Sequence, residues 1–300
     1  MSMNRETNGP AGRIAYVNGR YLPFSQAGVH IEDRGLQFAD AVYEVWGVVG
    51  GLLCDEDEHF DRLERSLREI GVPMPMARAP FKLVLREMLR RNLVHDGLVY
   101  LQVTRGTARR DHPVPNPPLQ PNMILTARNV DAAGLAKRRN DGIAVITTPD
   151  ERWARCDIKS TGLLPNILAK TKARAAKAYE AWLVDGEGYV TEGSSTTAWI
   201  VDKDGQLITR DLSNAILPGV TRRVILKAAA EAQIPVRERQ FTPADAAGAR
   251  EAFISAATAA VMPVTSIDGK PVGDGKVGPL TRRIQELYAH AATGAAEKGR

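Results

Sequence analysis

The residues best suited to chemistry lie around Lys159, which stands between the apolar Ile158 and a turn that contains Gly162. Downstream, Glu192 is followed by a Gly-Ser-Ser loop. Lysine by type alone indicates little, since most lysines are solvated surface charges. A lysine amine next to apolar residues can, however, attack a carbonyl carbon, and covalent catalysis by lysine depends on that reaction. The two blocks together predict an amine held for covalent chemistry with a carbonyl compound.

Three further groups match what an aldehyde cofactor with a pyridine ring and a phosphate would need. A carboxylate such as Glu192 beside the ring nitrogen keeps that nitrogen protonated, so that the ring can accept electrons. A phosphate is bound by backbone N–H groups at the start of a helix and by an arginine. The candidates for these roles are the helix start at 219–221 and Arg62. Lys159 would supply the amine that forms a Schiff base with the aldehyde.

The composition is typical of a soluble globular protein with one large or two medium domains, since 44% of the 300 residues are hydrophobic and 25% are charged. No apolar run reaches membrane-spanning length, and the first ten residues lack the hydrophobic segment of a signal peptide. We therefore expect a cytoplasmic protein with no membrane partner. Cys54 and Cys156 provide no disulfide framework, which agrees with a reducing compartment.

The formal net charge of +5 favours an anionic small molecule at least as well as a nucleic acid. The basic residues are scattered among 35 acidic ones, with no arginine-rich arm and no alternation of basic and aromatic residues. We therefore expect small-molecule substrates, no nucleic-acid partner and no bound metal.

Residues 1–130 predict a small α/β domain. Asn18-Gly19 and Gly50-Gly51 stand between runs of apolar and β-branched residues, which is the pattern of tight β-hairpins. Apolar residues recur at helical spacing in two later segments. Helices are predicted at 58–70 and 80–93, and further strands at 98–106 and 123–127.

The polar stretch 131–137, which contains Gly134, predicts a linker, so the domain boundary is placed after residue 130. Residues 138–300 predict a larger C-terminal domain in which strands and helices both occur. Strands are predicted at 143–147, 181–185, 189–192, 197–201, 206–209 and 252–255, and helices at 166–180, 218–232 and 281–292.

Eight short segments, taken in their order and spacing, connect the chain to a known family. They are Glu32-Asp33-Arg34-Gly35, Ala41-Val42-Tyr43-Glu44-Val45, His59-Phe60-Asp61-Arg62-Leu63, Val103-Thr104-Arg105-Gly106-Thr107, the Lys159 block, Thr191-Glu192-Gly193-Ser194-Ser195, Leu217-Pro218-Gly219-Val220-Thr221-Arg222 and Ile267-Asp268-Gly269-Lys270. On these segments the chain resembles the fold-type IV pyridoxal-phosphate enzymes over residues 14–288, and it is most similar to the D-amino-acid transaminases. The group also contains branched-chain aminotransferases, aminodeoxychorismate lyases and R-selective amine transaminases.

The resemblance implies a two-domain α/β (α+β) fold. A small N-terminal α/β domain would precede a larger C-terminal domain that has a β-barrel-like core and carries the lysine. The resemblance also implies a homodimer, because in D-amino-acid transaminases a substrate-binding loop comes from the neighbouring subunit. An arginine and a histidine one residue apart on that loop bind the substrate α-carboxylate together with a tyrosine, and Arg110, His112 and Tyr43 match them.

The resemblance assigns pyridoxal 5'-phosphate as the cofactor and gives each candidate residue a role. Lys159 would hold the cofactor as a Schiff base and then carry a proton between the substrate α-carbon and the cofactor. Glu192 would pair with the ring nitrogen, Arg62 would bind the phosphate, and Leu217 would pack against the ring. The further cofactor-binding residues are Ser195, Gly219, Val220, Thr221, Ala257 and Thr258.

These assignments have structural alternatives. Lys159 could be a solvated lysine, and Glu192 a surface glutamate at the end of a strand. Arg62 could form an ion pair along its own helix with Glu58. The segment around Arg110 could be a basic loop that is exposed to solvent.

The function that the resemblance implies is ping-pong transamination of D-amino acids with 2-oxo acids, 2-oxoglutarate or pyruvate, through a Schiff base on Lys159. A branched-chain L-amino-acid aminotransferase or an R-selective amine transaminase is the alternative within the group, and the set of Tyr43, Arg110 and His112 argues against both. A non-catalytic binding protein with the same fold is a remote alternative. The presence of both Lys159 and Glu192 argues against it.

Overall fold

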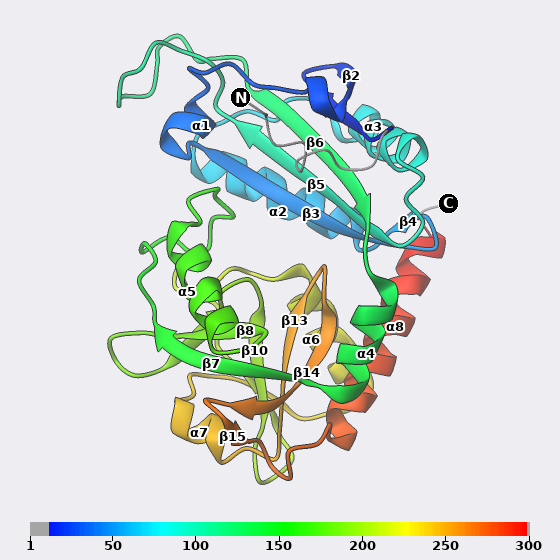
Figure 1. Ribbon diagram of the computed structural model, residues 1–300, viewed down its shortest axis with the longest axis vertical. Helices are drawn as coiled ribbons and strands as arrows, with labels where there is room; N and C mark the ends of the chain where they lie inside the picture. Colours follow the sequence, from blue (N-terminus) through cyan, green and yellow to red (C-terminus); the bar gives the residue numbers. More distant parts are fainter. Residues whose placement is uncertain (1–11, 299–300) are drawn as a thin grey trace, which may run out of the picture. The chain divides into compact units, whose positions relative to one another are not determined.

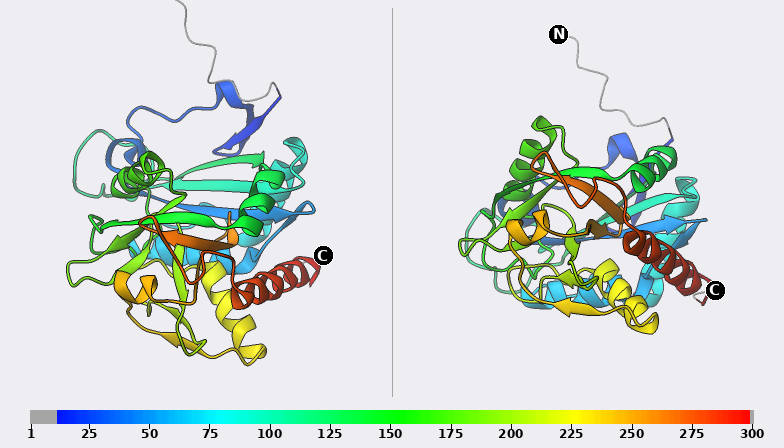
Figure 2. Two further views of the ribbon diagram at one scale, coloured as in Figure 1. Left: turned by 60° about the horizontal axis from the view of Figure 1, so that its bottom comes forward. Right: turned by 90° about the horizontal axis from the view of Figure 1, so that it is seen from below.

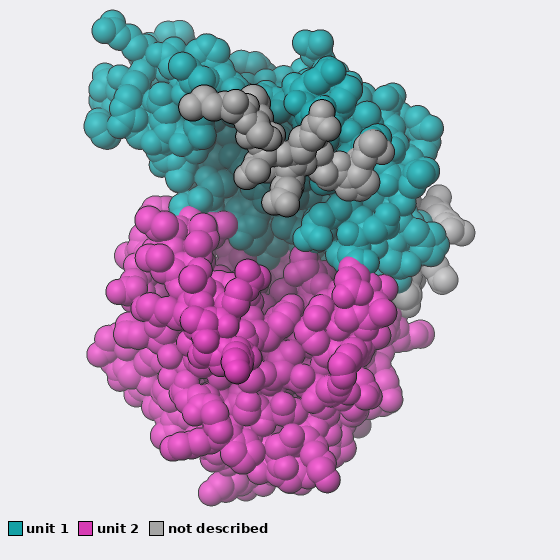
Figure 3. All heavy atoms as spheres, viewed as in Figure 1, with its two compact units in different colours: residues 1–130, 158–162 teal, residues 131–157, 163–300 magenta. Residues whose placement is uncertain are grey.

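The computed structural model describes residues 12–298, and it describes side chains up to Ala292. The chain divides into two compact units, coloured separately in Figure 3. Unit 1 consists of residues 1–130 and 158–162, and unit 2 of residues 131–157 and 163–300. The segment of Lys159, residues 158–162, belongs to unit 1 because its backbone pairs with a strand of that unit, and the predicted domain bounds stay a prediction.

Unit 1 contains a six-stranded sheet in the order β2-β1-β6-β5-β3-β4, in which every pair is antiparallel (Figure 1). The predicted hairpins are present at Asn18-Gly19 and Gly50-Gly51, where all four residues have positive φ. The strands are β1 (Ile14–Val17), β2 (Arg20–Pro23), β3 (Ala41–Val49), β4 (Leu52–Leu53), β5 (Gly97–Thr104) and β6 (Asn122–Asn129).

The core of unit 1 lies between this sheet and two helices, α2 (Glu56–Glu69) and α3 (Arg78–Arg91). Alternate residues of β3 face α2, so Trp46 is fully buried against Phe60, whose ring also packs on Phe81 of α3. The side chains between them, such as Tyr43, point to the other face of the sheet. The remaining helical segments of unit 1 are η2 (Phe24–Gln26) and α1 (Arg34–Phe38).

Unit 2 is built on a nine-stranded sheet in the order β12-β11-β10-β13-β14-β7-β8-β9, with β15 paired to β14. Although β9 and β10 are far apart in this order, they contact each other through a tight connection, so the sheet curls back on itself. This confirms the predicted barrel-like core. The strands are β7 (Ile143–Pro149), β8 (Glu180–Val184), β9 (Val190–Gly193), β10 (Thr197–Val201), β11 (Leu207–Thr209), β12 (Val236–Glu238), β13 (Glu251–Ala256), β14 (Ala260–Ile267) and β15 (Lys270–Pro271).

Helices flank the curled sheet of unit 2. The long α6 and α8 lie side by side (Figure 2). They cover Trp199 and Phe253, whose rings stack on one face of the sheet. Among residues 12–298, no helix combines the length and the apolar character needed to cross a membrane. The helices are α4 (Ala132–Asp141), α5 (Leu164–Ala175), α6 (Val220–Glu231), α7 (Pro243–Ala247) and α8 (Pro279–Lys298).

The segment predicted as a linker, residues 131–137, is mostly helical. Asp131 accepts a hydrogen bond from Gly134 N, at 2.9 Å, and thereby caps the N-terminus of α4. Small and polar residues suggested a flexible stretch, but an aspartate three residues before a glycine N–H is also a helix start. That alternative was missed.

Candidate active site

The backbone of the lysine segment is held at the edge of β3. Tyr43 N donates a hydrogen bond to Lys159 O at 3.0 Å, and Thr161 N donates to Ala41 O at 3.1 Å. Ile158 is buried in the core of unit 1. Because this apolar neighbour anchors the segment, the Lys159 side chain stays on the sheet surface, where its Nζ lies 4.1 Å from the centre of the Tyr43 ring. Two of the predicted residues, Lys159 and Tyr43, are therefore brought together.

A buried ion cluster lies on the other face of β3, below this lysine. Glu44 is fully buried and accepts hydrogen bonds from Arg62 Nε at 2.7 Å and Arg62 Nη2 at 2.9 Å. It also accepts one from His59 Nδ1 at 2.8 Å. His59 and Arg62 share one face of α2 because they are three residues apart. The predicted phosphate ligand, Arg62, is thus oriented by a carboxylate of β3 rather than by Glu58.

Electrostatics fix the charge states of this cluster. Burial alone would raise the pKa of Glu44, but the charge of Arg62 and the hydrogen bonds from Arg62 and His59 hold that pKa far below its ordinary value. Burial lowers the pKa of His59 and outweighs the attraction of Glu44, and the nearby charges of Arg62 and Lys159 lower it further. Glu44 is therefore an anion, and His59 a neutral imidazole, at neutral pH.

The other predicted substrate-binding residues, Arg110 and His112, lie in the connection between β5 and β6 and are exposed. Both pack on Phe38, with Arg110 Cζ 4.5 Å and the His112 ring 5.4 Å from the centre of the phenyl ring. Among the described residues, no hydrogen bond or ring contact joins either side chain to Tyr43, whose aromatic partner is Tyr100. The structure thus brings Arg110 together with His112 within one chain, but not with Tyr43.

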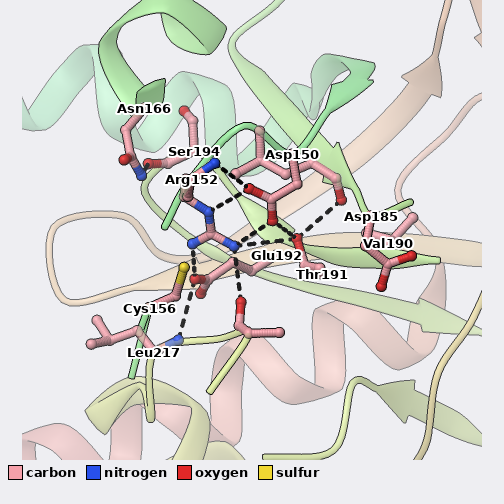
Figure 4. Close-up of polar contacts among 12 residues, drawn as sticks. Asp150, Arg152, Cys156, Asn166, Asp185, Val190, Thr191, Glu192, Ser194 and Leu217 are labelled. Atoms are coloured by element: carbon pink, nitrogen blue, oxygen red, sulfur yellow. Dashed lines mark hydrogen bonds and ion pairs between the residues drawn. The ribbon is translucent and has the colours of Figure 1, made fainter. Parts of the chain in front are cut away.

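In unit 2, Glu192 near the end of β9 belongs to a second ion cluster, drawn in Figure 4. It accepts hydrogen bonds from Arg152 Nη1 and, at 3.2 Å, from the backbone N of Leu217. Arg152 also binds Asp150 through Nε at 2.9 Å and Nη2 at 2.8 Å. Thr191 also belongs to the cluster, because its Oγ1 donates a hydrogen bond to Asp150 Oδ2 at 2.7 Å. One guanidinium therefore holds two carboxylates in place.

Arg152 was missed by the sequence analysis. It lies 40 residues from Glu192 along the chain, so no pattern within a short segment of the sequence predicts that these two residues are in contact. Although burial lowers its pKa, the hydrogen bonds and charges of Asp150 and Glu192 raise that pKa overall, and Arg152 stays charged. The neighbouring Cys156 was interpreted as a small packed residue, and burial raises the pKa of its thiol to about 11.

The predicted helix start is present as the N-terminus of α6, with Gly219 as the N-cap and no side chain that caps it. The first backbone N–H groups of any helix lack partners within the helix, and those of Val220 and Thr221 belong to this set. Thr221 Oγ1 is buried without a hydrogen-bond partner among the described residues. A buried unpaired hydroxyl beside free helix amides fits an anion such as a phosphate.

The other predicted cofactor-binding residues of unit 2 lie in two turns. Ser195 is in the short connection between β9 and β10, and its Oγ donates to Glu180 Oε2 at 2.8 Å. Ala257 and Thr258 form the turn between β13 and β14, where Thr258 is exposed. The roles of these residues remain predictions, as do those of Leu217 and Gly219.

Each unit therefore holds groups suited to part of a phosphorylated pyridine cofactor. In unit 1, Arg62 is suited to a phosphate, and in unit 2 the start of α6 is suited to one as well. The carboxylate of Glu192, held next to a second carboxylate, is suited to a protonated ring nitrogen. The residues present thus fit a phosphorylated pyridine cofactor.

Comparisons with known proteins agree with this chemistry. Residues 41–267 match the family model of the class IV amino-transferases. A curated relative, the D-alanine aminotransferase of Staphylococcus epidermidis, is 41% identical over 273 residues, which cover 91% of this chain and 95% of the relative. The D-alanine aminotransferase of Bacillus licheniformis is 41% identical over 268 residues, which cover 89% of this chain and 93% of the relative.

Solved structures of branched-chain amino acid aminotransferases have the same fold. The Escherichia coli protein superposes with a TM-score of 0.85 at 26% sequence identity, over 94% of this chain and 95% of that one. The protein from Thermoproteus uzoniensis, solved with norvaline, superposes with a TM-score of 0.82 at 26% identity, over 95% of this chain and 96% of that one. A further member solved with pyridoxamine 5'-phosphate superposes with a TM-score of 0.85 at 28% identity, over 95% of both chains. The predicted fold class is confirmed by these structures.

Proposed function

Since the chain belongs to the class IV aminotransferase family, we propose that it is a pyridoxal 5'-phosphate-dependent transaminase of D-amino acids. The proposal rests above all on the 41% identity to D-alanine aminotransferases along nearly the whole chain. Tyr43, Arg110 and His112, which match the carboxylate-binding set of that subfamily, support the same substrate class. The amino acceptor is a 2-oxo acid, 2-oxoglutarate or pyruvate, and the two substrates react in turn at one site.

The bound cofactor supplies a ring that withdraws electrons from the substrate α-carbon. Glu192 keeps the ring nitrogen protonated, because a carboxylate in a buried site favours the charged pyridinium. Arg62, the backbone amides of Val220 and Thr221, and the Thr221 hydroxyl bind the phosphate. Arg152 would hold the Glu192 carboxylate in place through its hydrogen bond.

Lys159 has two roles in this proposal. Its Nζ would hold the cofactor, and as a positioned amine it would take a proton from the substrate α-carbon and give one back. Its backbone is fixed by β3, so the amine can swing only about its own side chain. Tyr43, whose ring lies 4.1 Å from Nζ, limits that swing on one side.

The substrate α-carboxylate is bound by Arg110 and His112 together with Tyr43. Since the loop of Arg110 and His112 does not contact Tyr43 within the described residues, we propose that the working enzyme is a homodimer in which this loop completes the partner's site. A guanidinium, an imidazole and a phenol together form a strong carboxylate receptor. Measuring the molar mass in solution tests this assembly directly.

Substrate assays separate the proposal from its alternatives. The holoenzyme is tested with D-alanine, L-leucine and (R)-1-phenylethylamine, each with 2-oxoglutarate and with pyruvate. We expect activity with D-alanine. Activity on L-leucine alone would instead identify a branched-chain enzyme, the function of the superposed solved structures, and would reject the D-specific proposal.

A second experiment tests the covalent role of Lys159. Borohydride reduction of the holoenzyme should fix the cofactor on the peptide that contains Lys159, as detected by mass spectrometry. Lys159→Ala should remove this label and lower kcat at least about 1000-fold. The matched control is Lys137→Ala, which replaces an exposed lysine of α4 and should keep both the label and the rate. Label on another lysine would refute the assignment.

A further inference from the structure

The two ends of the loop that carries Arg110 and His112 lie close together where the loop leaves the sheet. We call this place, at Gly106 and Gln120, the neck. Gly106, two residues beyond the end of β5, has φ +117°, and a Cβ atom at this position would lie 2.3 Å from Gln120 O. The two ends of the loop are therefore in contact at a place that only glycine tolerates. The residues between them make a long excursion beside α1 (Figure 1).

The start of α1 is tied to the base of this loop. Arg34 N donates to Gly106 O at 2.9 Å, and Ala108 N donates to Glu32 O at 3.3 Å. Asp33 caps α1 and also accepts hydrogen bonds from Thr104 Oγ1 at 2.7 Å and from Asn122 Nδ2 at 2.6 Å. Because residues 104 and 122 end the two strands that flank the loop, α1 and the neck form one hydrogen-bonded block.

Arg34 extends this block to the functional part of the loop. Its buried guanidinium donates to the backbone O of Asp111 at 2.6 Å and of His112 at 3.1 Å. Its Nε donates to Asp40 at 2.8 Å, and Arg105 donates to the same carboxylate oxygen at 2.7 Å. Burial raises the pKa of Asp40, but these two arginines lower it overall, so the carboxylate stays charged and Arg34 is fixed.

Phe38, one turn further along α1, is the surface on which the loop side chains rest. The guanidinium of Arg110 lies over its ring, the His112 ring packs beside it, and Arg34 Cζ is 4.9 Å from its centre. Arg34 of α1 thus holds the loop backbone, and Phe38 of the same helix supports the side chains of Arg110 and His112.

We propose that Arg34, held by Asp40, is a positioning residue that fixes the Asp111-His112 backbone so that Arg110 and His112 present their donors together to the substrate carboxylate. This inference rests on the proposed function, since it assumes that the two side chains bind that carboxylate. Only a planar guanidinium can reach two successive carbonyls and a carboxylate at once. The loop is ordered on folding, so substrate binding does not have to order it.

The experiment compares Arg34→Lys with wild type in steady-state transamination of D-alanine. Lysine keeps the charge next to Asp40 but cannot bind both carbonyls. We expect KM for D-alanine and the inhibition constant of propionate, a carboxylate without an amino group, to rise about 10-fold each. The kcat should change less than about 3-fold, because the reacting groups are untouched. The matched control is Arg109→Ala, which removes an exposed arginine of the same loop and should leave both constants unchanged.

Hydrogen exchange supplies a readout that is independent of turnover. Amides in the peptide spanning residues 107–119 should exchange faster in Arg34→Lys and at the wild-type rate in Arg109→Ala. If Arg34→Lys fails to fold, Phe38→Leu removes the side-chain support without breaking the ion pair and should raise KM in the same direction. If the wild type is active with D-alanine and the folded Arg34→Lys variant has an unchanged KM, the positioning role is refuted while the proposed function stands. A wild type inactive with D-alanine refutes the proposed function, and this role with it.

Discussion

Each unit has a buried ion cluster built around an arginine, and the two clusters differ in the number of carboxylates. In unit 1, Arg62 and the neutral His59 surround a single buried carboxylate, Glu44. In unit 2, a single guanidinium, Arg152, holds two carboxylates. The first cluster balances one guanidinium against one carboxylate, and the second has an excess of negative charge.

The two clusters thus differ in the group that each can offer to a ligand. A guanidinium such as that of Arg62 is the kind of group that binds a phosphate, and a carboxylate such as that of Glu192 is the kind that pairs with a protonated ring nitrogen. In each case one ion of the cluster serves mainly to orient another. Glu44 orients Arg62, and Arg152 orients Glu192. The sequence analysis assigned no role to Glu44 or Arg152. It did predict roles for Arg62 and Glu192, the residues that these two orient.

The largest effect is expected from removing the negative charge of the second cluster. Glu192→Gln should lower kcat about 100- to 1000-fold, because the neutral amide no longer keeps the ring nitrogen protonated. Arg152 would still be held by Asp150, so the fold should persist. The control is Glu187→Gln in the exposed turn before β9, with wild-type kcat. An unchanged kcat in Glu192→Gln would mean that this carboxylate does not serve the ring.

The next effect concerns the first cluster. Glu44→Gln should lower the free energy of unfolding by about 3 kcal/mol, since removing one partner of a buried ion pair leaves Arg62 uncompensated. Urea denaturation of the cofactor-free protein measures this. Glu58→Gln on α2, at a less buried position, serves as the control and should lower the free energy of unfolding far less. Equal losses in the two variants would show that Glu44 has no special role in unit 1.

A smaller effect separates cofactor binding from stability. Thr221→Val should weaken the affinity for pyridoxal 5'-phosphate about 10-fold, because one hydrogen bond to the phosphate is lost. The cofactor-free protein should keep its stability, since Thr221 Oγ1 has no partner there to lose among the described residues. Thr281→Val is the matched control, because its hydroxyl is also buried and unpaired in the described part of the chain. If both variants bind the cofactor as wild type does, α6 does not bind the phosphate.

The smallest effect is a pH dependence of the first cluster. His59 has a lowered pKa in the folded state, so its contribution to stability is fully present above its ordinary value of 6.5 and is lost as the pH falls below it. Glu44 adds to acid destabilisation only below its ordinary value of 4.5. Unfolding free energies measured between pH 7 and pH 5 should therefore decline less in His59→Gln than in wild type. Parallel curves would contradict the buried neutral imidazole.

Local sequence features were sufficient for part of the fold and for the positions of the chemical groups. Asn18-Gly19 and Gly50-Gly51 determine hairpins because their backbone conformation is favoured by the residue types themselves. Spacing within one helix places His59 and Arg62 on the same face. The order of the short motifs identified the fold and cofactor class, since each motif keeps its own local geometry.

Only the tertiary structure decided how these groups are oriented. The contacts of Arg62 with Glu44, of Arg152 with Glu192, and of Arg34 with the loop each join residues that are 18 to 78 positions apart. No periodicity encodes such a contact, because it depends on which strands pair and which faces they bury. Backbone hydrogen bonds with β3 also place the Lys159 segment in unit 1. The sequence by itself determined which chemical groups this protein has, and folding decided which of them hold the others in place.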